Sequence, residues 1–106
     1  MEFVHKVDMD GLSGAIDYKV PLAQERYRLA KECAFRVVDG ELKEMHRIEQ
    51  AEMLMIKMKD YVTKVDCVAG DLKIDNFDLL SMDSRGSESL QELGVKLLNG
   101  TLLGKP

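Results

Sequence analysis

The chain has 106 residues, of which 45% are hydrophobic and 32% charged, a balance typical of one folded domain rather than a disordered chain. Nineteen acidic against fifteen basic residues give a net charge of −4, which argues against a general nucleic-acid binder, because such proteins neutralise phosphates with basic side chains. No long uncharged apolar run occurs, so the sequence predicts no membrane-spanning segment.

The first segment alternates apolar and polar residues and predicts a β-hairpin. Residues 3–8 and 16–20 have the period of two that a strand requires. Between them, Asp10-Gly11 and Ser13-Gly14 supply turn residues. Pro21 ends the second strand and suits the first turn of a helix, because its φ is fixed near the helical value and it lacks an N–H.

The middle of the chain predicts two helices. Residues 22–35 repeat apolar side chains at spacings of three and four, with charged residues between them. Residues 35–38 are compatible with an extension of this helix or with a short extended segment, and Asp39-Gly40 breaks the chain after them. Residues 41–61 carry the longest periodic run, which predicts a second and longer helix.

A second short hairpin is predicted by the β-branched alternation of residues 62–68 and by residues 72–74, with a glycine turn between them. Asp75 or Asn76 is placed to cap a short helical turn through Leu80, with a loop over these residues as the alternative.

The last predicted element is a helix that ends at Asn99-Gly100. Residues 84–87 are rich in serine and glycine and predict a loop, with Ser87 as the N-cap of that helix. The sequence therefore predicts a small mixed α+β fold with an N-terminal β-hairpin, two main helices, a second short hairpin and a C-terminal helix. These elements form a single domain over residues 1–100, followed by a short flexible tail over residues 101–106.

Few side chains suggest chemistry. Cys33 and Cys67 form no CxxC pair and are interpreted as reduced core thiols of a cytosolic protein, with a disulfide between them left open. His5 and His46 have no second ligand at metal-binding spacing, and no GxSxG, P-loop or GxGxxG motif occurs. We therefore expect no catalytic site, no metal site and no cofactor, and the chain is predicted not to be an enzyme.

Methionines are frequent in the second predicted helix and widen its apolar stripe beyond what a surface helix needs. Flexible thioether side chains suit a surface that accepts several partner geometries, and plain core filling is the alternative interpretation. On the first interpretation, Met55→Asp and Met58→Asp weaken partner binding and leave the domain folded. The candidate partner-binding residues are Met53, Leu54, Met55 and Met58 in the helix and Leu102 and Leu103 in the tail.

The order of these features over most of the chain resembles the tail assembly chaperones of long-tailed bacteriophages. The resemblance is one of layout, and it begins where Tyr18-Lys19-Val20-Pro21 leads into a charged helix. It continues through a longer helix, the hairpin segments Val62–Cys67 and Leu72–Ile74, the segment Asn76–Leu80 and a final helix that closes on Leu97-Leu98-Asn99-Gly100.

The resemblance implies an α+β domain that self-associates as a homo-oligomer and binds the tape measure protein before the tail tube polymerises. It also implies that the chain acts in the cytoplasm of the infected bacterial host, with no nucleic acid and no membrane as partner. Two other readings stay open. One is a small acidic chaperone of a secretion system, and the other is a structural tail-completion or head–tail joining protein of the virion.

Overall fold

The N-terminal hairpin is formed by β1 (Glu2–Met9) and β2 (Leu12–Lys19) in a computed structural model that describes residues 2–99. Asp10 and Gly11 make the turn, and Gly11 has a φ of 86°, a conformation that is easily adopted only by glycine. The strands pair antiparallel along their whole length. The predicted hairpin is confirmed, with longer strands than the alternation indicated.

The second predicted hairpin, β5 (Val62–Ala69) with β6 (Leu72–Ile74), is also confirmed and extends the first into one sheet. The strand order is β1-β2-β5-β6 and every neighbouring pair is antiparallel. β2 and β5 approach closely at Gly14, where a Cβ would collide with the backbone of Asp66. Gly14 therefore lies inside a strand, and its assignment to a turn was wrong.

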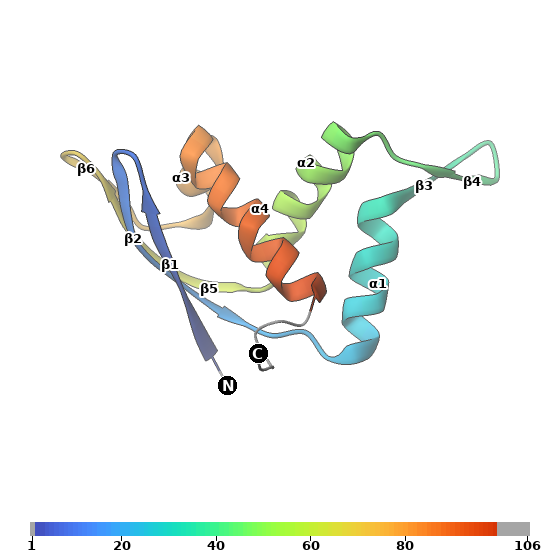
Figure 1. The fold of residues 1–106 in the computed structure, drawn as a ribbon, viewed down its shortest axis with the longest axis horizontal. Helices are drawn as coiled ribbons and strands as arrows, with labels where there is room; N and C mark the ends of the chain where they lie inside the picture. Colours follow the sequence, from blue (N-terminus) through green and yellow to red (C-terminus); the bar gives the residue numbers. More distant parts are fainter. Residues whose placement is uncertain (1, 100–106) are drawn as a thin grey trace.

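One face of this sheet forms the floor of the core, and α3 (Phe77–Met82) and α4 (Ser84–Asn99) pack over it (Figure 1). The buried side chains alternate along each strand, as the two-residue period of a strand requires. The buried strand residues are His5, Val7, Leu12, Ile16, Tyr18, Val65, Cys67 and Ile74, and α4 adds Leu90, Leu93 and Leu97.

The final helix begins earlier than predicted, because residues 84–87 form its first turn and not a loop. Asp83 stands just before it, and its Oδ1 accepts hydrogen bonds from the backbone N–H groups of Arg85, at 2.9 Å, and Gly86, at 3.1 Å. These bonds satisfy donors that the first turn of a helix leaves free. Asp83 rather than Ser87 is thus the N-cap. For the short helix α3, Asn76 is confirmed as the cap, since its Oδ1 accepts from the N–H of Leu79 at 2.8 Å.

The second main helix, α2 (Arg47–Lys57), is shorter than the predicted 41–61 and is followed by a 3₁₀ turn at Met58–Asp60. His46 caps it, because the His46 Nδ1 accepts from the N–H of Ile48 at 3.3 Å. The prediction of a helix from residue 41 is therefore wrong at its N-terminal end.

The residues in front of α2 form a second, separate two-stranded sheet instead. β3 (Phe35–Val38) and β4 (Glu41–Glu44) pair antiparallel through Asp39 and Gly40, whose φ values of 51° and 80° fit a type I′ turn. We call residues 35–44 the arm, because it projects from the end of the molecule opposite the four-stranded sheet (Figure 1). The Cα radius of gyration of 14.4 Å exceeds the roughly 13 Å of a compact chain of this length.

The first main helix, α1 (Ala23–Ala34), lies where residues 22–35 predicted it and packs with α2 and α4 beyond the sheet (Figure 1). α2 and α4 come close at Gly94, where an added Cβ would lie 2.5 Å from the Cγ of Leu54. The predicted α+β class is confirmed. Among the helices that the structure describes, none has the length and apolar character to cross a bilayer.

Candidate functional site

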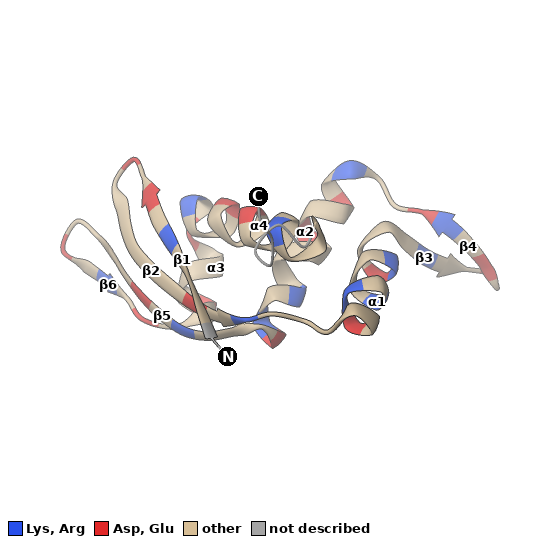
Figure 2. Cartoon of the chain, turned by 60° about the horizontal axis from the view of Figure 1, so that its bottom comes forward, with Lys and Arg blue, Asp and Glu red and all other residues tan. Residues whose placement is uncertain are grey.

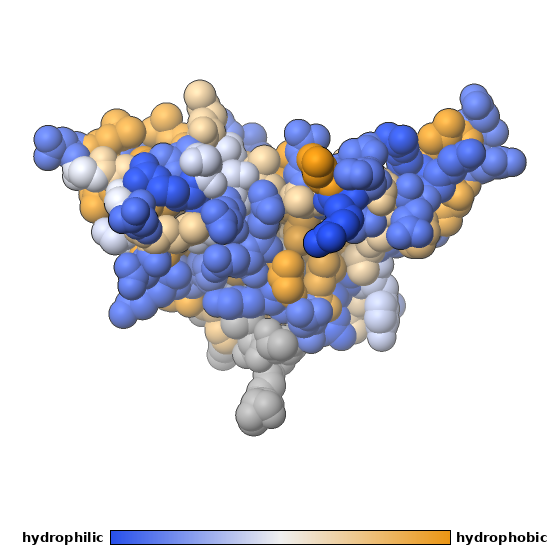
Figure 3. Space-filling model, turned by 45° about the horizontal axis from the view of Figure 1, so that its top comes forward, coloured by the Kyte–Doolittle hydropathy of each residue, from blue (hydrophilic) through white to orange (hydrophobic). Residues whose placement is uncertain are grey.

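An apolar hollow of about 350 Å³ lies where α1, α2 and α4 meet, and we call it the groove. Figure 3 shows apolar side chains in the middle of the molecule, between the arm and the sheet. The groove is lined by Ala30, Cys33 and Ala34 of α1, by Arg47, Gln50, Ala51 and Leu54 of α2, and by Gln91, Val95 and Leu98 of α4.

The groove exists because the residues on its walls are small. Ala30 and Ala34 lie one helical turn apart on α1 and share a face, and Ala51 faces the same hollow from α2. None of these methyl groups reaches far enough to fill the space between the helices. Val95 on α4 keeps 49% of its surface exposed, so apolar area stays in contact with water. A concave hollow lined mainly by apolar side chains is the kind of surface at which proteins bind ligands and partners.

The groove has little reactive chemistry. Cys33 is its one thiol, and burial raises the pKa of that thiol above its ordinary value, so the protonated form dominates at neutral pH. Arg47 is the one charged side chain on the wall. The arrangement suits the burial of apolar side chains under a polar edge rather than bond chemistry.

The structure separates the four residues of the second predicted helix that were expected to bind a partner. Leu54 lines the groove, but its side chain belongs to the core and is 7% exposed. Met58 is completely buried, while Met53 and Met55 are half-buried and pack against the core. We therefore reverse one expectation: Met58→Asp should disrupt the fold rather than only the binding of a partner.

The tail residues Leu102 and Leu103 lie outside the described residues. Reasoning from the sequence missed the walls of the groove on the other helices, Ala30 and Ala34 on α1 and Val95 on α4. For α1, the available signal was the pair of alanines four residues apart, because small side chains on one helix face leave space beside a neighbouring helix. Nothing in the sequence indicated that α4 would lie opposite them.

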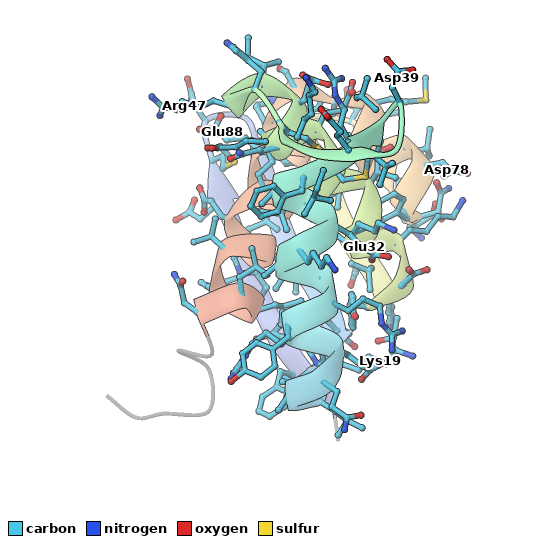
Figure 4. All side chains as sticks on the ribbon, turned by 90° about the vertical axis from the view of Figure 1, so that its right-hand side faces the viewer. Lys19, Glu32, Asp39, Arg47, Asp78 and Glu88 are labelled. Carbon is cyan, nitrogen blue, oxygen red and sulfur yellow. The ribbon has the colours of Figure 1, made fainter. Side chains whose placement is uncertain are left out.

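A second hollow, of about 260 Å³, lies on the other side of α1 and is polar. Figure 4 shows Lys19 and Glu32 on one side of α1 and Arg47 on the other. The Nζ of Lys57 lies 3.4 Å from the Oε1 of Glu32 within this hollow. Its lining carries three basic and three acidic side chains, Lys19, Arg28, Lys57, Glu25, Glu32 and Asp60, so the charges balance and favour no ligand of one sign.

The most perturbed titratable group lies in the core, between β1 and α4. The Nδ1 of His5 lies 2.9 Å from the Nζ of Lys96, and its Nε2 lies 3.3 Å from the Oγ of Ser89. Because an ammonium group only donates, Nδ1 accepts and Nε2 carries the proton. Burial first, and the Lys96 charge second, lower the pKa of His5 from 6.5 to about 4.

This serine–histidine pair is buried on all sides, with Ser89 1% and His5 4% exposed. A substrate has no access to the Ser89 hydroxyl, so the pair cannot act as a nucleophile and its base. It links the sheet to α4 instead.

Within residues 2–99, no group of three or more His, Cys, Asp or Glu side chains is arranged to hold a metal ion. Cys33 and Cys67 are free and buried. Comparison of the chain with protein-family models, with curated proteins and with solved structures found no match.

Proposed function

We propose that this protein is a non-enzymatic tail assembly chaperone of a long-tailed bacteriophage, which binds the tape measure protein during tail morphogenesis in the cytoplasm of the infected host. The observation that carries the proposal is the groove, an apolar hollow between three helices with Val95 exposed at it. The layout of the sequence supports the choice of family.

A groove of this kind fits one face of an amphipathic helix. Helix-in-groove recognition places apolar side chains at spacings of three, four and seven residues into a hydrophobic channel. The proposed partner is a long helical protein, so many of its segments present such a face. The small side chains on the walls leave room for anchors of different size, as a chaperone of a long chain needs.

The proposal is tested by co-expressing the tagged chain with the tape measure protein and measuring how much tape measure protein co-purifies. Val95→Asp puts a charge into the groove at an exposed position, and should reduce recovery at least tenfold with little change in melting temperature. Val4→Asp is the matched control, because Val4 is also exposed, at 64%, but lies on β1 away from the groove.

Equal recovery with both variants would contradict the groove as the binding site, and the absence of recovery with the wild-type chain would contradict the proposed partner. Recovery of the N-terminal segment of a secreted effector would instead favour the small acidic secretion-type chaperone. Detection of the chain in purified phage particles would favour a tail-completion or head–tail joining protein, because an assembly chaperone leaves before the particle is finished.

A further inference from the structure

The arm is an amphipathic hairpin whose apolar face is exposed. Directly opposite residues of an antiparallel pair share a face, and the register places Val37 opposite Leu42 and Arg36 opposite Lys43. Phe35, Val37 and Leu42 share one face with Glu44, and the three apolar side chains are 39%, 70% and 56% exposed. The ion pair between Arg36 and Glu49 of α2 holds the charged face at the root of the arm. A two-stranded hairpin that projects into water is marginally stable on its own, and additional strands would stabilise it.

The backbone of β4 exposes hydrogen-bonding groups at defined positions. In a hairpin with a two-residue turn, the residues that flank the turn, here Val38 and Glu41, form a hydrogen-bonded pair, and such pairs alternate along the ladder. The N–H of Met45 donates to the carbonyl of Ala34 at 2.7 Å, as this alternation requires. Leu42 is therefore in a non-hydrogen-bonded pair with its neighbour on β3, and its N–H and C=O point to the free edge of β4.

Two antiparallel copies of β4 centred on Leu42 would have complementary charges. If a two-fold axis passes beside this residue, Leu42 meets Leu42 of the second copy in a hydrogen-bonded pair. Glu41 then lies opposite Lys43 of the second copy, and Lys43 opposite Glu41, so two pairs of opposite charge form on the same face. Figure 2 shows a basic position between acidic ones along β4. Opposite charges placed directly across a strand pair are stabilising, and like charges are destabilising.

We propose that two copies of this chain pair antiparallel along β4, so that their arms form one four-stranded sheet in the order β3-β4-β4-β3. The pairing joins the two exposed apolar faces into one continuous strip. Because four residues on each side make a small interface, the dimer is weak and reversible.

The other edge of the arm is less suited to self-pairing. A two-fold axis at Val37 of β3 would place Arg36 opposite Val38 of the second copy, which offers no carboxylate to the guanidinium. In the monomer Arg36 is paired with Glu49 of α2, and the Nζ of Lys43 lies 3.9 Å from the Oε2 of Glu41 on its own strand. Pairing along β4 lets Lys43 gain Glu41 of the second copy, whereas pairing along β3 offers Arg36 no carboxylate. The charge pattern therefore selects β4 over β3. The proposal does not depend on what occupies the groove.

The test is sedimentation velocity over 1 to 300 μM, at low salt, with the full chain and charge-reversed variants of β4. Glu41→Lys places two lysines of one copy opposite those of the other, and Lys43→Glu does the same with glutamates. Each variant alone should dimerise at least about tenfold more weakly than the wild type, because two symmetric pairs change from attractive to repulsive. An equimolar mixture of the two variants, and the double variant E41K/K43E, should restore dimerisation.

The melting temperature of each variant shows that the fold is intact, since these side chains lie outside the core. A wild-type chain that stays monomeric throughout this range would overturn the proposal. So would a mixture that fails to recover the dimer, or single variants that dimerise as well as the wild type. A dimer that resists both arm reversals but is lost in Val95→Asp would place the interface in the groove instead.

Discussion

At the level of single residues, a few buried or capping side chains join segments that are distant in the sequence. His5 is buried between β1 and α4 with both ring nitrogens in contact, and Asp83 caps α4 while its Oδ2 lies 2.9 Å from the Nη2 of Arg85. The Arg85 hydrogen bonds lower the pKa of Asp83 to about 2. Arg85 also donates to the carbonyl of Asp10 at 3.1 Å, so the cap of α4 is tied to the turn of the first hairpin.

The buried His5 makes the stability depend on pH. Its pKa is lowered from 6.5 to about 4 in the folded chain, so between these values the unfolded chain binds a proton that the folded chain does not. The free energy of unfolding should therefore fall as the pH is lowered through this window, by about 2 kcal/mol between pH 7.5 and pH 5. Urea unfolding at the two pH values measures it.

His5→Gln keeps polar atoms for Lys96 and Ser89 but does not titrate, so most of this pH dependence should disappear. His46→Asn is the control, because it replaces the exposed histidine and keeps an acceptor at the N-cap of α2. Equal losses of stability in His5→Gln and the wild type between pH 7.5 and pH 5 would show that His5 is not the group responsible.

Gly94 permits the close approach of α2 and α4. An added methyl group would lie 2.5 Å from the Cγ of Leu54, so Gly94→Ala should lower the free energy of unfolding by roughly 1 to 3 kcal/mol. Leu54→Ala alone should cost about 2 to 5 kcal/mol, because it empties part of the core. In the double variant the new methyl group occupies vacated space, so its cost should be clearly below the sum. Additive losses would show that the two residues do not share one contact.

At the scale of elements, α2 shows how one helix divides its apolar residues between the core and the surface. Met58, just after its last turn, is completely buried, whereas Ile56 is 50% exposed and Met55 lies between these extremes. The wide apolar band therefore contacts the core on one side, and only part of it remains for a partner.

Met58→Asp should abolish cooperative unfolding or lower the free energy of unfolding by more than about 4 kcal/mol, because it buries an unpaired carboxylate. Ile56→Asp, two positions away on the exposed side, should fold with a melting temperature near that of the wild type. Circular dichroism melts distinguish the two. A Met58→Asp chain that melts like the wild type would contradict the burial of Met58 in the core.

Most of the elements could be predicted from local pattern, since a period of two or of 3.6 and a turn residue suffice for β1, β2, α1, β5 and β6. The arm could not. Residues 41–44 continue the helical period of α2, and only pairing with β3 through Asp39-Gly40 decides that they are extended. Likewise, the start of α4 looked like a loop because of its serines and Gly86, but that glycine is required where α4 meets α3.

For the molecule as a whole, the four-stranded sheet lies at one end and the arm at the other (Figure 1), and the groove is formed where α1, α2 and α4 meet. The groove could not be predicted because three helices from distant parts of the sequence form it. Its volume depends on small side chains in its walls, and these form no sequence motif. We propose that this groove holds a helix of another polypeptide.

Hydrogen–deuterium exchange of the chain, alone and in complex with the tape measure protein, tests that claim most directly. We expect slower exchange in the complex over residues 30–34, 47–54 and 91–98, with β1 and β6 unchanged. Protection confined to the four-stranded sheet, with the three groove helices exchanging as in the free chain, would contradict it.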